Sequence, residues 1–150
     1  MDFVQDNRSC SFANVLRGLH YQIERPQGKL VHVVVGEVLD VIVDLRRSSP
    51  TFGKWESYRL SSLNQLFLWV PPGFAHGFYV LSETTQFVYK TTEYYQPQYE
   101  RTILWNDPDL KIDWQLQGQP VLSAKDQMGL CFRSAPVYEE AKRMTATAGA

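Results

Sequence analysis

Residues 29–45 read KLVHVVVGEVLDVIVDL, and this stretch decides the fold. It is rich in β-branched residues, which favour strands, and its Gly-Glu pair at 36–37 predicts a turn between two of them. From Leu39 to Leu45 the odd-numbered positions are aliphatic, while Asp40 and Asp44 share the opposite face. A period of two is typical of a strand with one buried side. The stretch therefore predicts a β-hairpin whose second strand is half-buried.

Short strand-like segments continue along the chain, separated by turns rich in Gly, Pro, Ser and Asn. The sequence has no βαβ alternation and no repeat of fixed period. Residues 60–65, as a single turn, and residues 136–144, with acidic residues early and basic residues late, have helical character. Many short strands between tight turns predict an all-β sandwich or barrel, and we expect one domain over residues 1–150. The further predicted strands are WESYRL at 55–60, LFLWV at 66–70, GFYVL at 77–81 and TTQFVYKTT at 84–92.

The charges of the chain nearly balance, with 15 Lys and Arg against 16 Asp and Glu and a net charge of -1. Such a chain has no general attraction to nucleic acid or to an anionic membrane, so an anionic ligand needs a local cluster of cations. No apolar run reaches the roughly 18 residues that cross a bilayer, and the start, MDFVQDNRS, lacks the pattern of a signal peptide. We expect a soluble, cytoplasmic protein whose cysteines, Cys10 and Cys131, are free and at least half-buried.

Several residues suited to proton transfer stand next to glycine turns or within predicted strands. Taken singly, each has an ordinary structural explanation: histidines in strands form structural hydrogen bonds, tyrosines pack in cores, and a lysine flanks a hairpin. In a barrel, however, inward-facing residues of several strands meet in one cavity, so together they form a candidate site. The set comprises His20 in LRGLHYQ (16–22), Lys29 in QGKL (27–30), and His76 and Tyr89 in PPGFAHGFYVLSETTQFVYKTTEYY (71–95).

These three motifs resemble the active site of the dTDP-4-dehydrorhamnose 3,5-epimerases, and the resemblance covers nearly the whole chain. It implies a cupin-type double-stranded β-helix, or jelly roll, with a short C-terminal helix. It also implies a homodimer without a cofactor that acts on dTDP-4-dehydro-6-deoxyglucose. The expected product is dTDP-4-dehydro-L-rhamnose, an intermediate of deoxysugar and surface polysaccharide biosynthesis.

The resemblance also assigns roles in this reaction. The protons to be removed lie on C3 and C5, next to the C4 ketone, so the reaction needs a base, a group that stabilises the enolate oxygen, and an acid on the other ring face. His20 matches the family's base and Asp126, in VLSAKD, its orienting carboxylate. Lys29 matches the cation near the C4 oxygen, and Tyr89 matches the acid.

The substrate-binding residues of the family also have counterparts in this chain. Arg17 and Lys125 match cations near the phosphates and the sugar, for which a guanidinium is well suited. His76 matches a second pocket histidine that hydrogen-bonds the sugar. The implied substrate-binding set is Gln5, Asn7, Arg17, His76, Tyr95, Glu100 and Lys125.

One departure from the family concerns the N-terminus. Family members usually carry an additional segment ahead of the strand that starts here at FVQDN, residues 3–7. In the family, this segment extends over the partner subunit and helps to close its nucleotide pocket. We therefore expect a shortened N-terminus relative to the family.

Three other functions fit parts of the same pattern. The first is a mono-epimerase that inverts only C3 or only C5, because such relatives keep much the same site residues. The second is a metal-dependent cupin with His20, His32 and His76 as ligands, although the HxH pair usual in metal-binding cupins does not occur in the sequence. The third is a sugar-nucleotide-binding protein without catalytic activity. We expect no bound metal.

Overall fold

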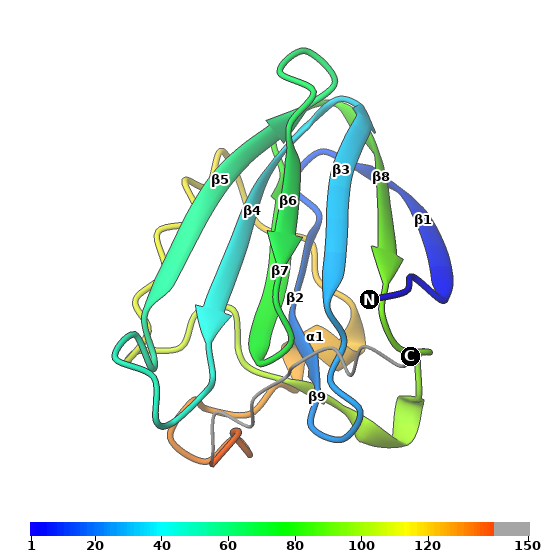
Figure 1. Ribbon diagram of the computed structural model, residues 1–150. Helices are drawn as coiled ribbons and strands as arrows, with labels where there is room; N and C mark the ends of the chain where they lie inside the picture. The colour runs from blue at the N-terminus through cyan, green and yellow to red at the C-terminus, as the bar shows by residue number, and fades with distance from the viewer. Residues whose placement is uncertain (140–150) are drawn as a thin grey trace.

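Two antiparallel β-sheets face each other in the computed structural model, which describes residues 1–139 (Figure 1). This arrangement confirms the predicted all-β jelly roll. In the first sheet the strand order is β1 (Gln5–Phe12), β8 (Thr84–Thr91), β3 (Lys29–Val35) and β6 (Phe67–Val70). In the second sheet it is β5 (Trp55–Ser61), β4 (Glu37–Asp44), β7 (Phe74–Val80), β2 (Leu16–Gln22) and β9 (Glu100–Thr102).

The predicted hairpin at residues 29–45 is wrong, although both of its strands exist. Strand β3 pairs with β6 and β8, whereas β4 pairs with β5 and β7, so the two strands belong to different sheets. Gly36, which has a φ of +83°, connects β3 in the first sheet to β4 in the second. A Cβ at this position would lie 2.1 Å from the carbonyl oxygen of Thr84. The turn was therefore located correctly, but strand propensity does not determine which strands pair.

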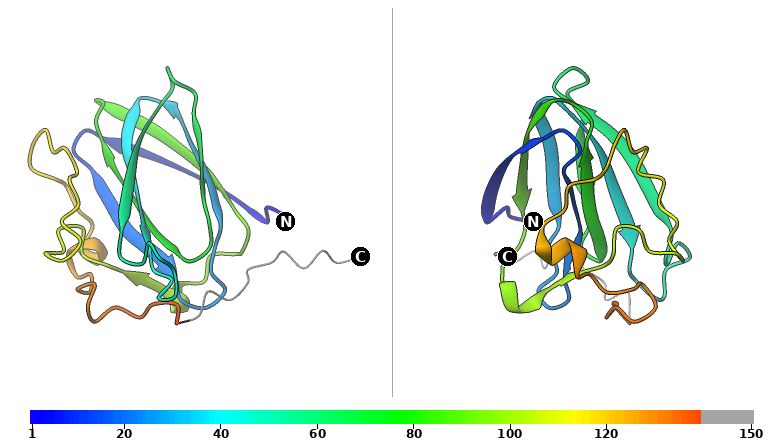
Figure 2. Two further views of the ribbon diagram at one scale, coloured as in Figure 1. Left: turned by 60° about the vertical axis from the view of Figure 1, so that its left-hand side comes forward. Right: turned by 180° about the vertical axis from the view of Figure 1, so that it is seen from behind.

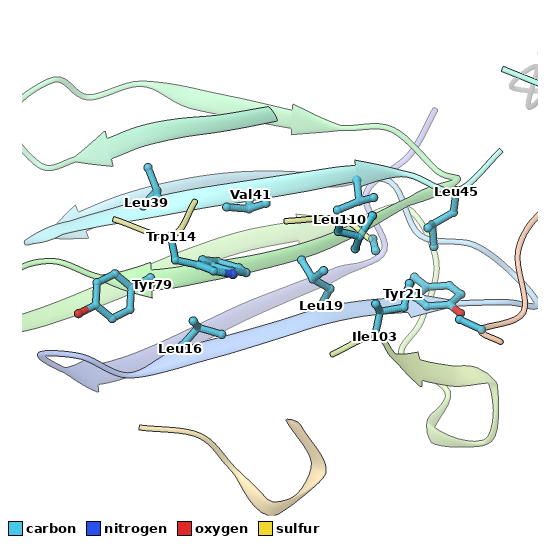
Figure 3. Close-up of a cluster of buried hydrophobic side chains, with 13 residues drawn as sticks. Leu16, Leu19, Tyr21, Leu39, Val41, Leu45, Tyr79, Ile103, Leu110 and Trp114 are labelled. Carbon is cyan, nitrogen blue, oxygen red and sulfur yellow. The ribbon is translucent and has the colours of Figure 1, made fainter. Parts of the chain in front are cut away.

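Strand β4 is buried on both faces rather than on one. Its odd-numbered residues, such as Leu39 and Val41, pack in a core on the outer side of the five-stranded sheet. Residues 103–138 cover this side and contribute Leu110 and Trp114 (Figures 2 and 3). The even-numbered residues face the space between the sheets, where a second core forms. The prediction of a half-buried strand was wrong because nothing in β4 signals that an irregular segment covers its outer face.

The helical predictions were also wrong within the described residues. Residues 62–64 form a turn after β5, and Tyr138 forms a β-bridge with Arg46 where a C-terminal helix was expected. Residues 140–144 of that expected helix lie outside the described residues. The structure instead has a one-turn α1 (Ala124–Gln127) and a short 3-10 helix, η1 (Pro97–Tyr99).

The two cysteines, Cys10 and Cys131, are free, as expected, but both are exposed rather than buried. Between residues 1 and 139, no helix is long and apolar enough to span a bilayer.

Candidate active site

A cavity of about 320 Å³ opens between the two sheets, on the side where β1 and β2 lie. Every residue of the predicted site lines it except Asp126, which lies behind His20. The predicted residues in the lining are Gln5, Asn7, Arg17, His20, Lys29, His76, Tyr89, Tyr95, Glu100 and Lys125.

Two glycines set the spacing of the strands that carry the histidines. A Cβ on Gly18 would lie 2.6 Å from the Cα of Gly77, and a Cβ on Gly77 would lie 2.6 Å from the carbonyl oxygen of Arg17. Only glycine allows β2 and β7 to approach this closely. Beyond the irregular step that follows Arg17, the register pairs His20 directly with His76. Both imidazoles therefore face the cavity side by side.

His20 is hydrogen-bonded to a carboxylate from a distant part of the chain. Its Nε2 lies 2.5 Å from Oδ1 of Asp126, which is buried at the start of α1. Burial acts to raise the pKa of Asp126, but the hydrogen bond and charge of His20, together with the hydrogen bonds from Gly18 and Ser123, lower this pKa. The ionised carboxylate has no proton to give, so Nε2–H donates to it. The other ring nitrogen, Nδ1, is left with its lone pair, as a general base requires.

Helix α1 holds Asp126 in this position through its N-cap. The hydroxyl of Ser123 accepts a hydrogen bond from the backbone N–H of Asp126, and the Gly18 backbone N–H lies 3.4 Å from its carboxylate. The sequence Ser-Ala-Lys-Asp at 123–126 has the spacing of a capping box, a signal that could have predicted this helix.

Lys29 enters the cavity from the first residue of β3. Burial lowers the pKa of Lys29 to about 8, against the opposing charges of Glu100 and Asp40. Lys29 is half-buried, and between residues 1 and 139 its ammonium faces the charges of Glu100 and Asp40 without a hydrogen bond to either. A cation in this condition interacts strongly with negative charge that develops on a ligand.

Tyr89, on β8, places a phenol hydroxyl in the lining of the cavity. Burial raises the pKa of Tyr89, and the charge of Glu100 adds to this rise. The phenol therefore stays protonated at neutral pH. Its ring packs against Phe87, with the two centroids 5.9 Å apart.

The mouth of the cavity carries a linked group of polar residues. Tyr95 donates to Glu100 at 2.8 Å, and the Lys125 ammonium lies 3.0 Å from both carboxylate oxygens of Glu100. Burial acts to raise the pKa of Glu100, but these hydrogen bonds lower it; burial and the bond to Glu100 raise the pKa of Tyr95 to about 12. Gln5 joins the group by accepting the backbone N–H of Tyr95.

The lining of the cavity is cationic although the chain is not. Arg8, Arg17, Lys29 and Lys125 line it against a single carboxylate, that of Glu100. This is the local cluster that an anionic ligand needs in a chain of net charge -1. Arg17 is exposed, so its guanidinium is free to bind a phosphate through two parallel hydrogen bonds.

Sequence reasoning missed several lining residues. Ser9 follows Gln5 and Asn7 at the same period of two in β1, and Phe87 precedes Tyr89 by two residues in β8. The alternation of side chains along each strand could have found both. Asp40 was also missed: its Oδ2 lies 2.8 Å from Nε2 of His76 beneath the cavity.

The three histidines nominated as metal ligands do not converge. His32 lies on the outer side of β3, where its ring stacks on Phe67 with centroids 4.4 Å apart, and it is not part of the cavity lining. Throughout residues 1–139, no group of three or more His, Cys, Asp or Glu side chains is arranged to hold a metal ion.

Comparison with known proteins identifies relatives of this fold and site. The family model described as dTDP-4-dehydrorhamnose 3,5-epimerase matches residues 1–134. The chain is 59% identical over 138 residues to the dTDP-4-dehydrorhamnose 3,5-epimerase of Pseudomonas aeruginosa, covering 92% of this chain and 76% of the relative.

Solved structures agree with the sequence relationship. The crystal structure of dTDP-6-deoxy-D-glucose-3,5-epimerase from Legionella pneumophila, in complex with dTDP-4-keto-L-rhamnose, matches with a TM-score of 0.88 and 52% identity over 90% of this chain and 72% of that one. A 3'-monoepimerase from Streptomyces bikiniensis, in complex with dTDP-quinovose, matches with a TM-score of 0.82 and 34% identity, covering 86% of this chain and 66% of that one. On this sequence and structural similarity, the chain belongs to the dTDP-4-dehydrorhamnose 3,5-epimerase family.

Proposed function

We propose that this protein inverts C3 and C5 of dTDP-4-dehydro-6-deoxyglucose, giving dTDP-4-dehydro-L-rhamnose. The observation that carries the proposal is the convergence of an oriented histidine, a half-buried lysine of lowered pKa and a protonated tyrosine on one cationic cavity. These groups are the base, the enolate stabiliser and the acid that inversion next to a ketone requires.

In the proposed reaction, Nδ1 of His20 removes a proton from the carbon next to the C4 ketone. Asp126 holds the imidazole in the tautomer that leaves this nitrogen unprotonated and stabilises the imidazolium that forms. The ammonium of Lys29 stabilises the negative charge on the C4 oxygen. Tyr89 then delivers a proton to the opposite face of the ring, and the centre is inverted.

The remaining cationic and polar groups are proposed to bind the nucleotide. Arg17 and Lys125 bind the diphosphate, with Arg8 contributing charge. Gln5, Asn7, Tyr95 and Glu100 contact the nucleoside and the sugar, and His76 hydrogen-bonds the sugar. This model is supported by the lining of the cavity and by the dTDP-sugar bound to the Legionella relative.

The direct test is incubation with the 4-keto sugar nucleotide in deuterated water, followed by NMR. Deuterium should enter C3 and C5, and the L-rhamno product should form. Absence of exchange at both carbons, with the nucleotide still bound, would instead favour a binding protein without catalytic activity. A chelator should leave exchange unchanged; loss of activity that added iron or zinc restores would favour the metal-dependent alternative.

The second candidate is a mono-epimerase, favoured by the similarity to the Streptomyces bikiniensis 3'-monoepimerase. The higher identity to the Legionella 3,5-epimerase, 52% against 34%, favours double inversion. Deuterium at a single carbon, with inversion at that carbon alone, would decide for the mono-epimerase.

We also propose that the protein is a homodimer, as the family resemblance implies. Apolar side chains are exposed on the outer face of the four-stranded sheet, among them Phe67 at 61%, Val34 at 42% and Trp69 at 36%. Contiguous apolar surface of this kind commonly marks an interface. Light scattering should give twice the mass of the chain, and Phe67→Asp should reduce that mass to a monomer's. A monomeric wild type would contradict the proposal.

A further inference from the structure

Asp40 lies in the middle of β4, on the side that faces the space between the sheets. It is fully buried, and its Oδ2 is bonded to Nε2 of His76 on the neighbouring strand β7. Its other carboxylate oxygen, Oδ1, is also buried and has no hydrogen-bond partner in the described part of the chain. The carboxylate therefore directs one oxygen to a cavity histidine and leaves the other unsatisfied.

This arrangement costs stability. A buried carboxylate oxygen without a partner loses its hydration and regains little, which is why such groups are rare in folded proteins. Asp44, on the same strand, is a carboxylate whose oxygens are satisfied. It accepts hydrogen bonds from Arg46, Ser49 and Thr51. Asp40 has no such set of donors, so stability alone does not explain it.

Three titratable groups face Asp40 from the surrounding elements. They are His76 from β7 and Lys29 from β3 in the opposite sheet, together with Tyr58, its register partner on β5, whose hydroxyl is directed away to Glu56. Burial raises the pKa of Asp40, and the hydrogen bond with His76 and the charge of Lys29 oppose that rise. In turn, Asp40 is one of the two carboxylates whose charge acts to keep Lys29 protonated against the effect of burial.

We propose that Asp40 is a positioning residue for the epimerisation, which holds His76 with Nδ1 available to the sugar and stabilises the ammonium of Lys29. Because Nε2 of His76 is committed to Asp40, Nδ1 is the ring nitrogen left for a ligand. The inference rests on the proposed function. It adds a second carboxylate–imidazole pair beside His20 and Asp126, built from β4 and β7 instead of from α1.

The test is Asp40→Asn, which keeps the shape of the side chain and removes its charge. We expect kcat to fall about 10- to 100-fold, as for other residues that orient a reacting group, while KM stays close to the wild-type value. The alkaline limb of kcat should move to lower pH, because Lys29 loses one of the charges that keep it protonated. The melting temperature should fall less than in the matched variant Asp44→Asn, because Asp40 has one hydrogen-bonded side-chain partner to lose where Asp44 has three.

Two further variants separate a positioning role from a structural one. Asp44→Asn, on the same strand and equally buried, should lower the melting temperature and leave the pH profile of kcat unchanged. In a His76→Asn background, Asp40→Asn should lower the plateau kcat little further, because the two residues act as one unit. If Asp40→Asn does not fold, Asp40→Ser also removes the charge and should show the same shift of the alkaline limb.

The outcomes distinguish this inference from the proposed function. A wild type that neither exchanges nor inverts would contradict the proposed function. An active wild type combined with an Asp40→Asn variant of equal kcat and unchanged pH profile would overturn the inference alone. A variant whose lower activity is fully accounted for by a smaller folded fraction would also overturn it.

Discussion

His20 and His76 stand directly opposite each other in the β2–β7 ladder, and each imidazole is hydrogen-bonded to its own buried carboxylate. Residues directly opposite in an antiparallel pair have Cβ atoms about 5 Å apart, so both rings can contact one six-membered sugar. The two carboxylates come from parts of the chain that are unrelated in sequence. The site is thus assembled by the packing of β4 and α1 against this strand pair.

Removing the base and removing the acid should give different results. His20→Ala should lower both solvent exchange and inversion by about two to four powers of ten, because no group abstracts the proton. Tyr89→Phe keeps the ring and deletes the proton donor, so the enolate still forms and exchange should survive better than inversion. Both rates can be followed by NMR in deuterated water.

The matched control for this pair is His32→Ala. His32 is a strand histidine outside the cavity, so its removal should leave both rates at the wild-type level. The assigned roles are wrong if Tyr89→Phe inverts as fast as the wild type, or if His20→Ala exchanges its protons at the native rate.

Asp126→Asn should lower activity for the same reason as His20→Ala, but by a smaller factor. The variant keeps the shape of the side chain but no longer favours the tautomer in which His20 Nδ1 is unprotonated. We expect kcat to fall by about 10- to 100-fold with little change in KM. Steady-state kinetics at neutral pH measure this, and a kcat equal to that of the wild type would show that His20 needs no orienting carboxylate.

Deprotonation of Lys29 above about pH 8 should lower the activity of the enzyme and raise its free energy of unfolding. The pKa of Lys29 is lowered from 10.5 to about 8, so activity should decline above pH 8 as the ammonium is lost. Between pH 8 and 10.5 the unfolded chain binds a proton that the folded chain has released, so raising the pH through this window favours folding.

The variant Lys29→Met isolates both effects. The variant should be nearly inactive at every pH. The difference in the free energy of unfolding, wild type minus Lys29→Met, should increase from pH 8 to pH 10.5. Urea titrations at several pH values test this. A difference that stays constant across the window would mean that Lys29 titrates normally.

Most residues of the candidate site could be selected from the sequence because they concentrate in short motifs. The resemblance in LRGLHYQ and QGKL was enough to select His20 and Lys29, and the cavity contains both. Asp40 was interpreted only as the polar side of a half-buried strand, since its contact with His76 depends on β4 lying beside β7. Strand pairing of this kind is a tertiary property that no local pattern encodes.

The covering of the five-stranded sheet was unpredictable for a related reason. The segment that carries Leu110 and Trp114 alternates apolar and polar residues as a strand does, yet it forms no strand and instead packs over the outer face of β4 (Figure 3). The hydrophobic alternation in β4 gave the correct faces, but it could not show that both would be buried.

The close approach of β2 and β7 gives the last prediction. In Gly77→Ala the new methyl group would lie 2.6 Å from the backbone carbonyl oxygen of Arg17, which cannot move without displacing β2. We expect a loss of about 1–3 kcal/mol in the free energy of unfolding, typical of overpacking, together with lower activity because His20 and His76 separate. Gly118→Ala is the control, since its Cβ would meet only the side chain of Asn14, at 3.3 Å, and should be tolerated. Urea denaturation and the rate of deuterium exchange measure the two effects. If Gly77→Ala were as stable and as active as Gly118→Ala, the spacing of the two strands would not be what positions the histidines.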